Sequence, residues 1–245
     1  MPDIIAEAGS NHNGSVERAC ALVDLASRAG ATSVKFQFIF ADSLYLPAYY
    51  EAGEYVDNPV YHSRKAEELS QDDWARIWRH ANNSGIDISA SVFDVQGVEL
   101  LSGLGAPYIK IASTDATNYE LIGHACEAFE RVVVSTGMAS LSEIDAMVRF
   151  VHSNFPRTDL FLMHCVSLYP CPLDRANVQR VRLIRDCFDC TVGYSDHTTG
   201  SVAAAMALVE GAGFVEKHFT TDRSLSGFDH AHAMEEEDFT RYIAT

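Results

Sequence analysis

Lysine is scarce in this chain, and most of its lysines stand in apolar surroundings. The 245 residues carry a formal net charge of −16 and contain four lysines. Three of these lie in short apolar runs around Lys35, Lys110 and Lys217. Because a lysine is rarely buried without a partner, lysines in predicted strands indicate a phosphate or carboxylate held inside the protein. The alternative is a lysine that pairs with a nearby carboxylate or extends its ammonium group to water, and we favour it for Lys217.

Two histidines follow late strands that we expect to be neighbours. His197 directly follows the predicted strand 191–196, and His218 lies near the end of the predicted strand 214–219. Because strand side chains alternate, His197 shares a face with Ser195, and His218 shares a face with Glu216 but not with Lys217. Two imidazoles at adjacent strand ends can bind an octahedral Mn²⁺ or Mg²⁺ that keeps positions open for water and substrate. Histidines held only by hydrogen bonds in the core are the alternative.

A carboxylate and several hydroxyls accompany these groups. Glu7 ends the first predicted strand, close to the eighth in a closed barrel, and could act as a base or orient a polar substrate group. An acid that pairs with a neighbouring lysine is the alternative. Ser113, Ser135 and Ser195 follow three other strands, and hydroxyls that converge with lysines could form a phosphate site. Each serine alone could equally cap the next helix.

Short β-branched runs alternate with amphipathic segments along the chain. The predicted strands are 3–9, 33–37, 87–92, 108–113, 131–136, 160–166, 191–196 and 214–219. The predicted helices are 15–30, 70–84, 95–104, 118–129, 140–153, 174–187 and 199–211. This order predicts a single-domain (β/α)₈ barrel over residues 1–245, with a last helix that is short or cut off. A doubly wound open sheet is the alternative, but no Gly-x-Gly-x-x-Gly turn supports it.

The connection from Phe38 to Leu69 is long and rich in tyrosines and acids. Long barrel loops often cover active sites, so we expect this segment to form part of the substrate site. A packed surface loop is the alternative.

The amino-acid composition limits the classes of protein to which this chain can belong. An apolar fraction of 47% supports a large core, and six scattered cysteines indicate reduced thiols in a cytoplasmic protein. The acidic balance argues against nucleic acid and anionic membranes as partners. We see no signal peptide and no apolar span long enough to cross a membrane.

The order of the motifs resembles the sialic acid synthase family from residue 3 to about 235. The matching motifs are Ile5-Ala-Glu7-Ala-Gly-Ser-Asn11-His12-Asn-Gly14, Val34-Lys35-Phe-Gln37, Lys110-Ile-Ala-Ser113, Ser135-Thr-Gly-Met138, His164-Cys-Val-Ser167-Leu-Tyr169-Pro170, Gly193-Tyr-Ser195-Asp-His197, Glu216-Lys-His218-Phe-Thr, Asp222-Arg223 and Gly227-Phe-Asp229. Such enzymes condense phosphoenolpyruvate with an open-chain N-acylated amino sugar to give a 2-keto sugar acid and phosphate.

The resemblance implies a role for each matching residue. Glu7 is the main acid/base candidate, and His197 and His218 are implied as catalytic ligands of a divalent metal, Mn²⁺ above all, with Mg²⁺ or Co²⁺ as further candidates. The implied phosphoenolpyruvate residues are Lys35, Lys110, Ser113, Ser135 and Ser195. The implied residues for the acceptor sugar are Gln37, Asp115, Tyr169 and Asp229. A homodimer is also implied.

Three departures from the family pattern concern the acceptor. The chain stops at Thr245, whereas the family usually continues into an antifreeze-like domain whose arginine reaches the partner's acceptor site. Asp115 stands where many relatives carry glutamate, and Ser167 stands where some have asparagine. We therefore expect weak or absent affinity for N-acetylmannosamine.

Two other functions remain open. A Schiff-base aldolase on the same barrel would use Lys110 as nucleophile and would need no metal. A non-catalytic sugar-binding relative is the third reading.

Overall fold

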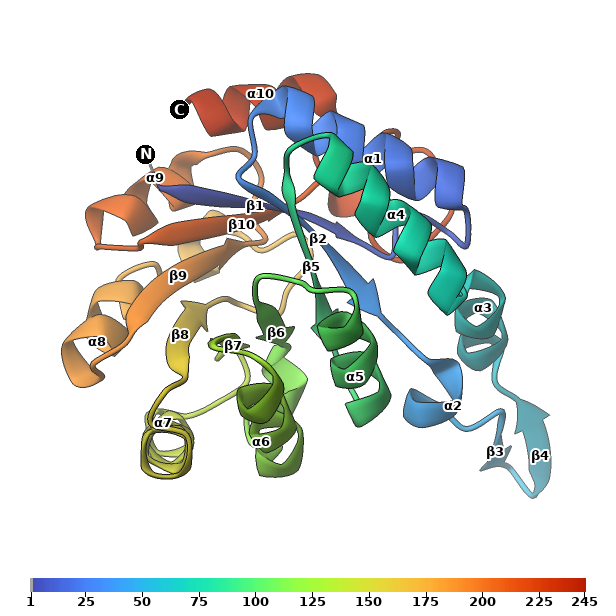
Figure 1. Ribbon diagram of the computed structural model, residues 1–245, viewed down its shortest axis with the longest axis horizontal. Coiled ribbons are helices and arrows are strands. Elements are labelled where there is room, and N and C mark those ends of the chain that lie inside the picture. Colours follow the sequence, from blue (N-terminus) through green and yellow to red (C-terminus); the bar gives the residue numbers. More distant parts are fainter. Residues whose placement is uncertain (1) are drawn as a thin grey trace.

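The computed structural model describes residues 2–245, and eight of its strands form a closed parallel barrel with helices outside it (Figure 1). The barrel strands are β1 (Asp3–Gly9), β2 (Ser33–Phe38), β5 (Asp87–Val92), β6 (Ile109–Ile111), β7 (Arg131–Ser135), β8 (Asp159–His164), β9 (Thr191–Asp196) and β10 (Phe214–His218). They follow one another around the barrel in chain order, and β10 pairs with β1 to close it. The predicted (β/α)₈ barrel is confirmed, and its strands lie within two residues of the predicted bounds.

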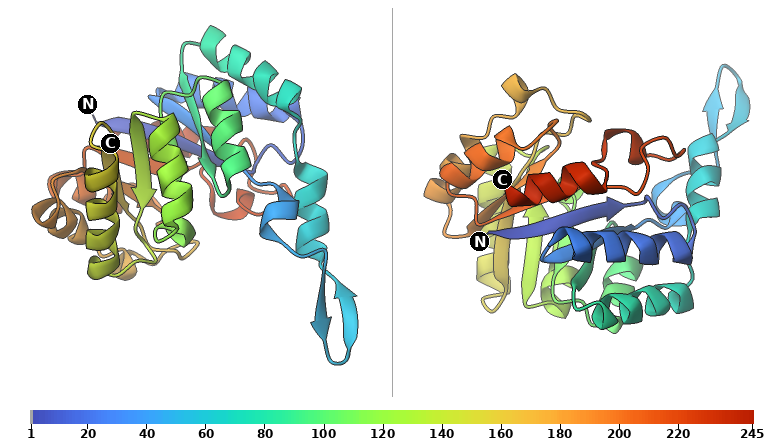
Figure 2. Two further views of the ribbon diagram at one scale, coloured as in Figure 1. Left: turned by 60° about the horizontal axis from the view of Figure 1, so that its bottom comes forward. Right: turned by 90° about the horizontal axis from the view of Figure 1, so that it is seen from above.

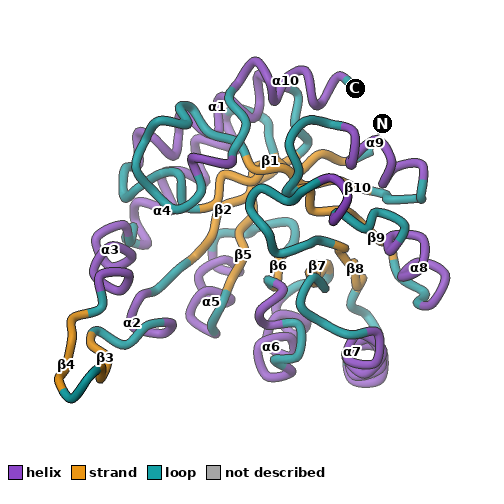
Figure 3. The backbone as a smooth tube through the Cα atoms, turned by 180° about the vertical axis from the view of Figure 1, so that it is seen from behind, coloured by secondary structure: helices purple, strands orange, loops and turns teal. Residues whose placement is uncertain are grey.

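The helices surround this barrel (Figure 3). They are α1 (Val16–Ala29), α4 (Gln71–Asn83), α5 (Val95–Gly103), α6 (Tyr119–Ala128), α7 (Leu141–Asn154), α8 (Arg180–Cys187), α9 (Val202–Val209) and α10 (Glu236–Ala244). The last helix is short, as predicted, and an ion pair of 2.9 Å between Arg28 and Glu236 joins it to α1. No helix in residues 2–245 has the length and apolar character that a membrane crossing requires.

Local sequence fixes where several helices begin and end. The Ser15 side chain accepts a hydrogen bond from the Arg18 amide at the start of α1, and Ser70 and Ser140 form reciprocal capping boxes at α4 and α7. Gly30 ends α1 in the left-handed conformation, with a φ of 89°. These signals lie in the sequence itself, which is why the helix bounds could be predicted from it.

The barrel interior is apolar at its N-terminal end and polar above it. Buried side chains close that end in a separate cluster that contains Ile5, Tyr108, Val133, Met163 and Phe214. The next inward-facing residues along the strands are polar, so the charged groups of the interior stand on an apolar floor. Substrate can reach them only from the C-terminal ends of the strands, where barrel enzymes carry their active sites.

Residues 38–69 carry secondary structure of their own rather than a plain loop, and their part in the substrate site stays a prediction. The segment forms α2 (Ala41–Leu44), a hairpin of β3 (Ala48–Glu51) and β4 (Glu54–Asp57), and α3 (Pro59–Glu67). The hairpin projects away from the barrel (Figure 2), and Tyr50 and Tyr55 are 67% and 82% exposed. Tyr50 and Tyr55 are cross-strand partners whose ring centroids lie 5.3 Å apart, a pair that stabilises the hairpin.

The predicted helix 174–187 is also corrected. Its first part is a 3₁₀ turn at Leu173–Arg175, and α8 begins only at Arg180. Asn177 between them has a φ of 47°, in the left-handed region that interrupts a helix.

We predict that Gly193→Ala destabilises the fold. Gly193 lies in β9, and an added Cβ would stand 2.4 Å from ring atoms of Phe214 in the barrel floor. We expect the free energy of unfolding in urea to fall by about 1–3 kcal/mol, the usual cost of overpacking a core. Gly103→Ala in α5 is the matched control, because nothing lies within 4 Å of its added Cβ. Equal unfolding midpoints for the two variants would contradict this packing.

Candidate active site

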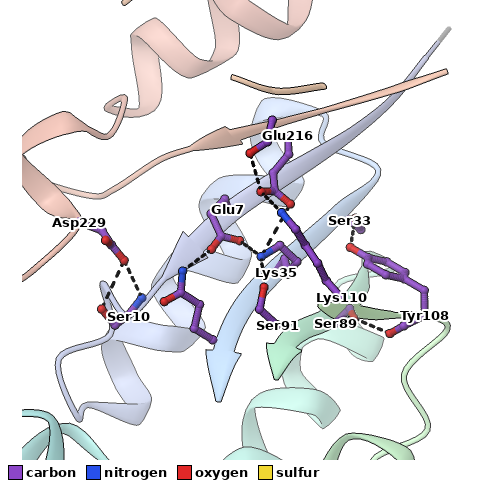
Figure 4. A network of polar contacts seen from close by, with 12 residues as sticks. Glu7, Ser10, Ser33, Lys35, Ser89, Ser91, Tyr108, Lys110, Glu216 and Asp229 are labelled. Atoms are coloured by element: carbon purple, nitrogen blue, oxygen red, sulfur yellow. Dashed lines mark hydrogen bonds and ion pairs between the residues drawn. The ribbon is translucent and has the colours of Figure 1, made fainter. Parts of the chain in front are cut away.

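Four charged side chains meet inside the barrel above its apolar floor (Figure 4). The Lys35 Nζ lies 2.5 Å from Glu7 Oε2 and 3.7 Å from Glu216 Oε2, and the Lys110 Nζ lies 2.5 Å from Glu216 Oε1. All four side chains are buried. We call Glu7, Lys35, Lys110 and Glu216 the charge cluster.

Strand register brings these residues together. Glu7 of β1 is the Cα partner of both Lys35 in β2 and His218 in β10, and side chains level with one another in parallel strands point to the same face. Glu216 lies two residues before His218 and therefore points inward as well. The lysines are thus paired with carboxylates, which was the alternative for Lys35 and Lys110.

The two acids of the charge cluster, Glu7 and Glu216, have very different pKa values. Burial raises the pKa of both, but Lys110 and then Lys35 outweigh it at Glu216 and lower its pKa to about 2. At Glu7 burial prevails over Lys35, the Glu216 charge adds to it, and the pKa rises to about 7. Burial also lowers the pKa of Lys110 more than Glu216 raises it. Near neutral pH the cluster therefore holds one fixed anion and one carboxyl group that can exchange its proton.

Neutral polar groups complete the cluster. The Ser91 hydroxyl accepts from Lys35 Nζ at 2.7 Å, and Gln37 Nε2 donates to Glu7 Oε1 at 2.9 Å. Ser195 Oγ donates to Glu216 Oε1 at 3.0 Å and lies 3.1 Å from His197 Nε2. Ser195 therefore links the charge cluster to the histidines.

His197 and His218 lie at the rim above the cluster, and their ring centroids are 5.8 Å apart. His197 Nδ1 lies 2.6 Å from the Val166 carbonyl, a contact that requires a proton on Nδ1 and leaves Nε2 as the acceptor. Burial lowers the pKa of His197 to about 4 and that of His218 to about 3, so both rings are neutral near pH 7. The Tyr169 ring packs against His197 with 4.1 Å between centroids.

Asp229 reaches the rim from the loop after β10. Its Oδ2 accepts from the Ser10 amide at 3.2 Å and from the Ser10 hydroxyl at 3.3 Å (Figure 4). An added Cβ at Gly9, whose φ is 54°, would stand 2.3 Å from this oxygen. Glycine at position 9 is therefore what allows Asp229 to approach β1.

Three predicted residues make other contacts. Ser113 Oγ accepts from the Gly137 amide at 3.1 Å and lies 3.1 Å from Cys165 Sγ, and Ser135 is buried at the end of β7. The Asp115 carboxylate bonds to Thr114 and Asn118 within its own turn. The structure therefore does not bring Asp115 into contact with the other predicted acceptor residues. Their roles stay predictions.

Lys217 belongs to the outer face of β10, as predicted. Its Nζ lies 3.1 Å from Asp196 Oδ2 and also donates to the Thr198 carbonyl. It is therefore a structural residue that packs beneath α10, where its Nζ lies 5.3 Å from the centre of the Tyr242 ring.

Three side chains near the site had no role in the sequence interpretation. Glu216 could have been found, since alternation puts it on the His218 face. His232 and Arg64 could not, because they reach the rim from a loop and from α3. Arg64 is buried, donates from Nη1 to Ser10 Oγ at 2.8 Å, and stacks over the Phe228 ring at 3.5 Å.

The sequence was compared with those of known protein families, and one family matches. The sequence profile of the NeuB family matches residues 22–245, which is most of the chain. The chain belongs to the NeuB family.

Relatives of this NeuB-family chain include named synthases. The N,N'-diacetyllegionaminic acid synthase of Legionella pneumophila is 37% identical, over 98% of this chain and 70% of its own length. The N-acetylneuraminate-9-phosphate synthase of Drosophila melanogaster is 34% identical, over 96% of this chain and 64% of its own. The solved sialic acid synthetase of Leptospira borgpetersenii serovar Hardjo-bovis, in complex with citrate, superimposes with a TM-score of 0.88 at 29% identity, over 99% and 81% of the two chains.

We predict that Glu7→Gln changes how stability depends on pH. Between its ordinary pKa of 4.5 and about 7, folded Glu7 binds a proton that the unfolded chain has released. The wild-type fold therefore loses stability as the pH rises through this window. Urea unfolding from pH 4.5 to 7 should show the free energy of unfolding of Glu7→Gln rising relative to that of the wild type. Glu99→Gln, on the exposed side of α5, should stay parallel to the wild type.

Proposed function

We propose that this chain condenses phosphoenolpyruvate with an open-chain aldose or N-acyl amino sugar, giving a 2-keto sugar acid and phosphate. The observation that carries this proposal is the charge cluster, in which two buried lysines and a carboxyl group with a pKa of about 7 lie directly beneath two neutral histidines. Membership of the NeuB family and the synthase names of the relatives support it.

The charge cluster can become an anion site by taking up one proton. With both carboxylates ionised, two acids balance two lysines, and no net charge remains to attract phosphate. When Glu7 is protonated, the cluster carries one net positive charge and Lys35 loses its ionic partner at 2.5 Å. Lys35 and Lys110 can then donate charge-assisted hydrogen bonds to the phosphate and carboxylate groups of phosphoenolpyruvate.

The histidines fit a divalent metal of the Mn²⁺ type, with Mg²⁺ or Co²⁺ as further candidates. The Val166 carbonyl fixes the His197 tautomer that leaves Nε2 as the acceptor, and His218 Nδ1 is buried without a hydrogen-bond partner among residues 2–245. Backbone carbonyls orient metal-binding histidines in the same way in other proteins. When bound, the ion would polarise the aldehyde of the open-chain sugar.

The chain's own residues hold the reactants and move one proton. A bond forms between C3 of phosphoenolpyruvate and the aldehyde carbon, water adds at C2, and phosphate leaves with its bridging oxygen. The water gives up both of its protons as its oxygen becomes the keto oxygen at C2: one ends on the former aldehyde oxygen and the other leaves with the phosphate. Glu7 can accept the first of these protons and pass it to the former aldehyde oxygen, because its pKa lies near neutral pH. Gln37 holds the Glu7 carboxylate in place through its hydrogen bond of 2.9 Å.

The acceptor sugar would bind at the rim near Gln37, Tyr169 and Asp229. Of the 38–69 segment, α3 rather than the hairpin contacts this region, through the hydrogen bond from Arg64 to Ser10. Ser10 in turn donates to Asp229. We therefore assign the segment's part in acceptor binding to Arg64. Asp115 stays a predicted acceptor residue, held within its own turn by Thr114 and Asn118.

We also propose that the protein works in the cytoplasm as a homodimer. All six cysteines are free thiols, which agrees with a reducing compartment. The projecting hairpin and the residues just before it expose the side chains of Leu46, Tyr50 and Tyr55, which a second copy could cover.

The reaction is tested by measuring phosphate release from phosphoenolpyruvate with Mn²⁺ and a panel of aldoses and N-acyl hexosamines. We expect release only when phosphoenolpyruvate, one class of acceptor and the metal are all present, and excess EDTA should stop it. Release that persists in EDTA would exclude the metal, and no release with any acceptor would count against the condensation.

We predict that Lys35→Gln weakens the binding of phosphoenolpyruvate by roughly 1.5–3 kcal/mol, the worth of a hydrogen bond to a charged group. Lys65→Gln is the matched control, because the Lys65 ammonium pairs with Asp42 and Glu68 outside the barrel. Titration calorimetry, with circular dichroism to check the fold, measures both. Wild-type affinity in Lys35→Gln would place the phosphate elsewhere.

The Schiff-base aldolase remains the second candidate because burial lowers the pKa of Lys110. Against it, the Lys110 ammonium pairs with Glu216 at 2.5 Å, which opposes loss of its proton. We expect borohydride to trap no covalent adduct of Lys110 with a keto acid. A trapped adduct, seen by mass spectrometry, would favour the aldolase.

A further inference from the structure

A third histidine lies beside the rim histidines, on the loop that also carries Asp229. His232 ends the 3₁₀ turn η3 (His230–His232), and its ring centroid is 4.9 Å from that of His218. One ligand atom each from His218, Asp229 and His232 all lie within 4.8 Å of one another. His197 is not a member of this group. The three residues share a single small volume at the rim.

Two nitrogens of this group have no hydrogen-bond partner among residues 2–245. They are His218 Nδ1 and His232 Nε2, and both are buried from solvent. A buried polar atom without a hydrogen-bond partner is unfavourable, so two such nitrogens facing one small volume indicate a bound ligand. Asp229 is fixed in orientation, because both of its hydrogen bonds from Ser10 end on Oδ2. That leaves Oδ1 as the carboxylate oxygen for a further partner.

We propose that His218, Asp229 and His232 bind one divalent first-row transition-metal ion, so that His232 is a metal ligand of this chain. The inference rests on the proposed function for the ion's role and adds two ligands to the pair His197 and His218. Together with His197, three imidazoles and one carboxylate leave two positions of an octahedral ion open, which an aldehyde oxygen and water can fill.

The position of the Tyr169 ring supports one shared site at the rim. This ring packs against His197 with centroids 4.1 Å apart and against His232 with centroids 4.9 Å apart. The three imidazoles therefore surround one aromatic side chain.

The imidazole that His232 adds from the loop also affects which ion the site prefers. Nitrogen ligands favour Mn²⁺, Co²⁺ and Zn²⁺ over Mg²⁺, which prefers oxygen. We expect Mg²⁺ to compete poorly with Mn²⁺ for this site.

The test measures metal binding directly. Mn²⁺ is titrated into the purified full chain, and the free ion is followed by electron paramagnetic resonance. His232→Ala should raise the Kd for Mn²⁺ at least tenfold, and His218→Ala should do the same. His124→Ala, at a half-buried histidine on α6, is the matched control and should bind Mn²⁺ as the wild type does. Circular dichroism checks that each variant is folded.

A spectroscopic variant separates a ligand from a residue that only supports the fold. In His232→Cys with Co²⁺, a thiolate on the metal should give a charge-transfer band in the near ultraviolet that the wild type and His124→Cys lack. Wild-type Mn²⁺ affinity in His232→Ala, together with no such band, would overturn the inference.

The outcomes also distinguish this inference from the proposed function. If His197→Ala and His218→Ala lose Mn²⁺ while His232→Ala keeps it, the two-histidine site stands and the inference fails. If His232→Ala loses Mn²⁺ but the wild type never releases phosphate from phosphoenolpyruvate, the metal site stands and the proposed function fails.

Discussion

The need to neutralise buried charge governs the inside of this barrel. An ionised group away from water is tolerated only with a charged partner and hydrogen bonds, and the charge cluster meets that need with two lysines, two glutamates and nearby hydroxyls. Removing one partner of such a pair typically costs about 3–5 kcal/mol, because the other charge remains buried. The cluster is therefore a constraint on the fold as well as a candidate site, and the strand register that aligns Glu7 with Lys35 is part of both.

The same need to neutralise buried charge gives the two glutamates different pKa values. Glu216 lies near both ammonium groups and stays ionised, whereas Glu7 has one close lysine and a neighbouring anion. Identical side chains acquire different pKa values from their surroundings, which is how acid and base roles are separated in many enzymes. An exchangeable proton on Glu7 links the charge state of the cluster to its capacity for anions. The apolar floor below sets the direction from which an anion enters.

The rim is built differently from the cluster. The C-terminal ends of β9 and β10 supply His197 and His218, but the loop after β10 supplies Asp229 and His232, and α3 supplies Arg64. Gly9 is the contact point that lets Asp229 approach β1, and Ser10 joins that carboxylate to Arg64. The deep part of the site thus depends on strand periodicity, while the part that would meet the acceptor depends on loops.

The sequence alone determined the alternation of strands and helices, the inward face shared by Ser195, Glu216 and His218, and the structural role of Lys217. These follow from local periodicity and capping, which any short segment carries by itself. Only the tertiary structure decided which carboxylate pairs with which lysine, that residues 38–69 contain a projecting hairpin, and that His232 lies beside His218. Such contacts join segments far apart in the chain, and their distances depend on barrel closure and loop paths that no local pattern encodes. The pKa of Glu7 belongs to this second group, because it arises from burial and from charges on other strands.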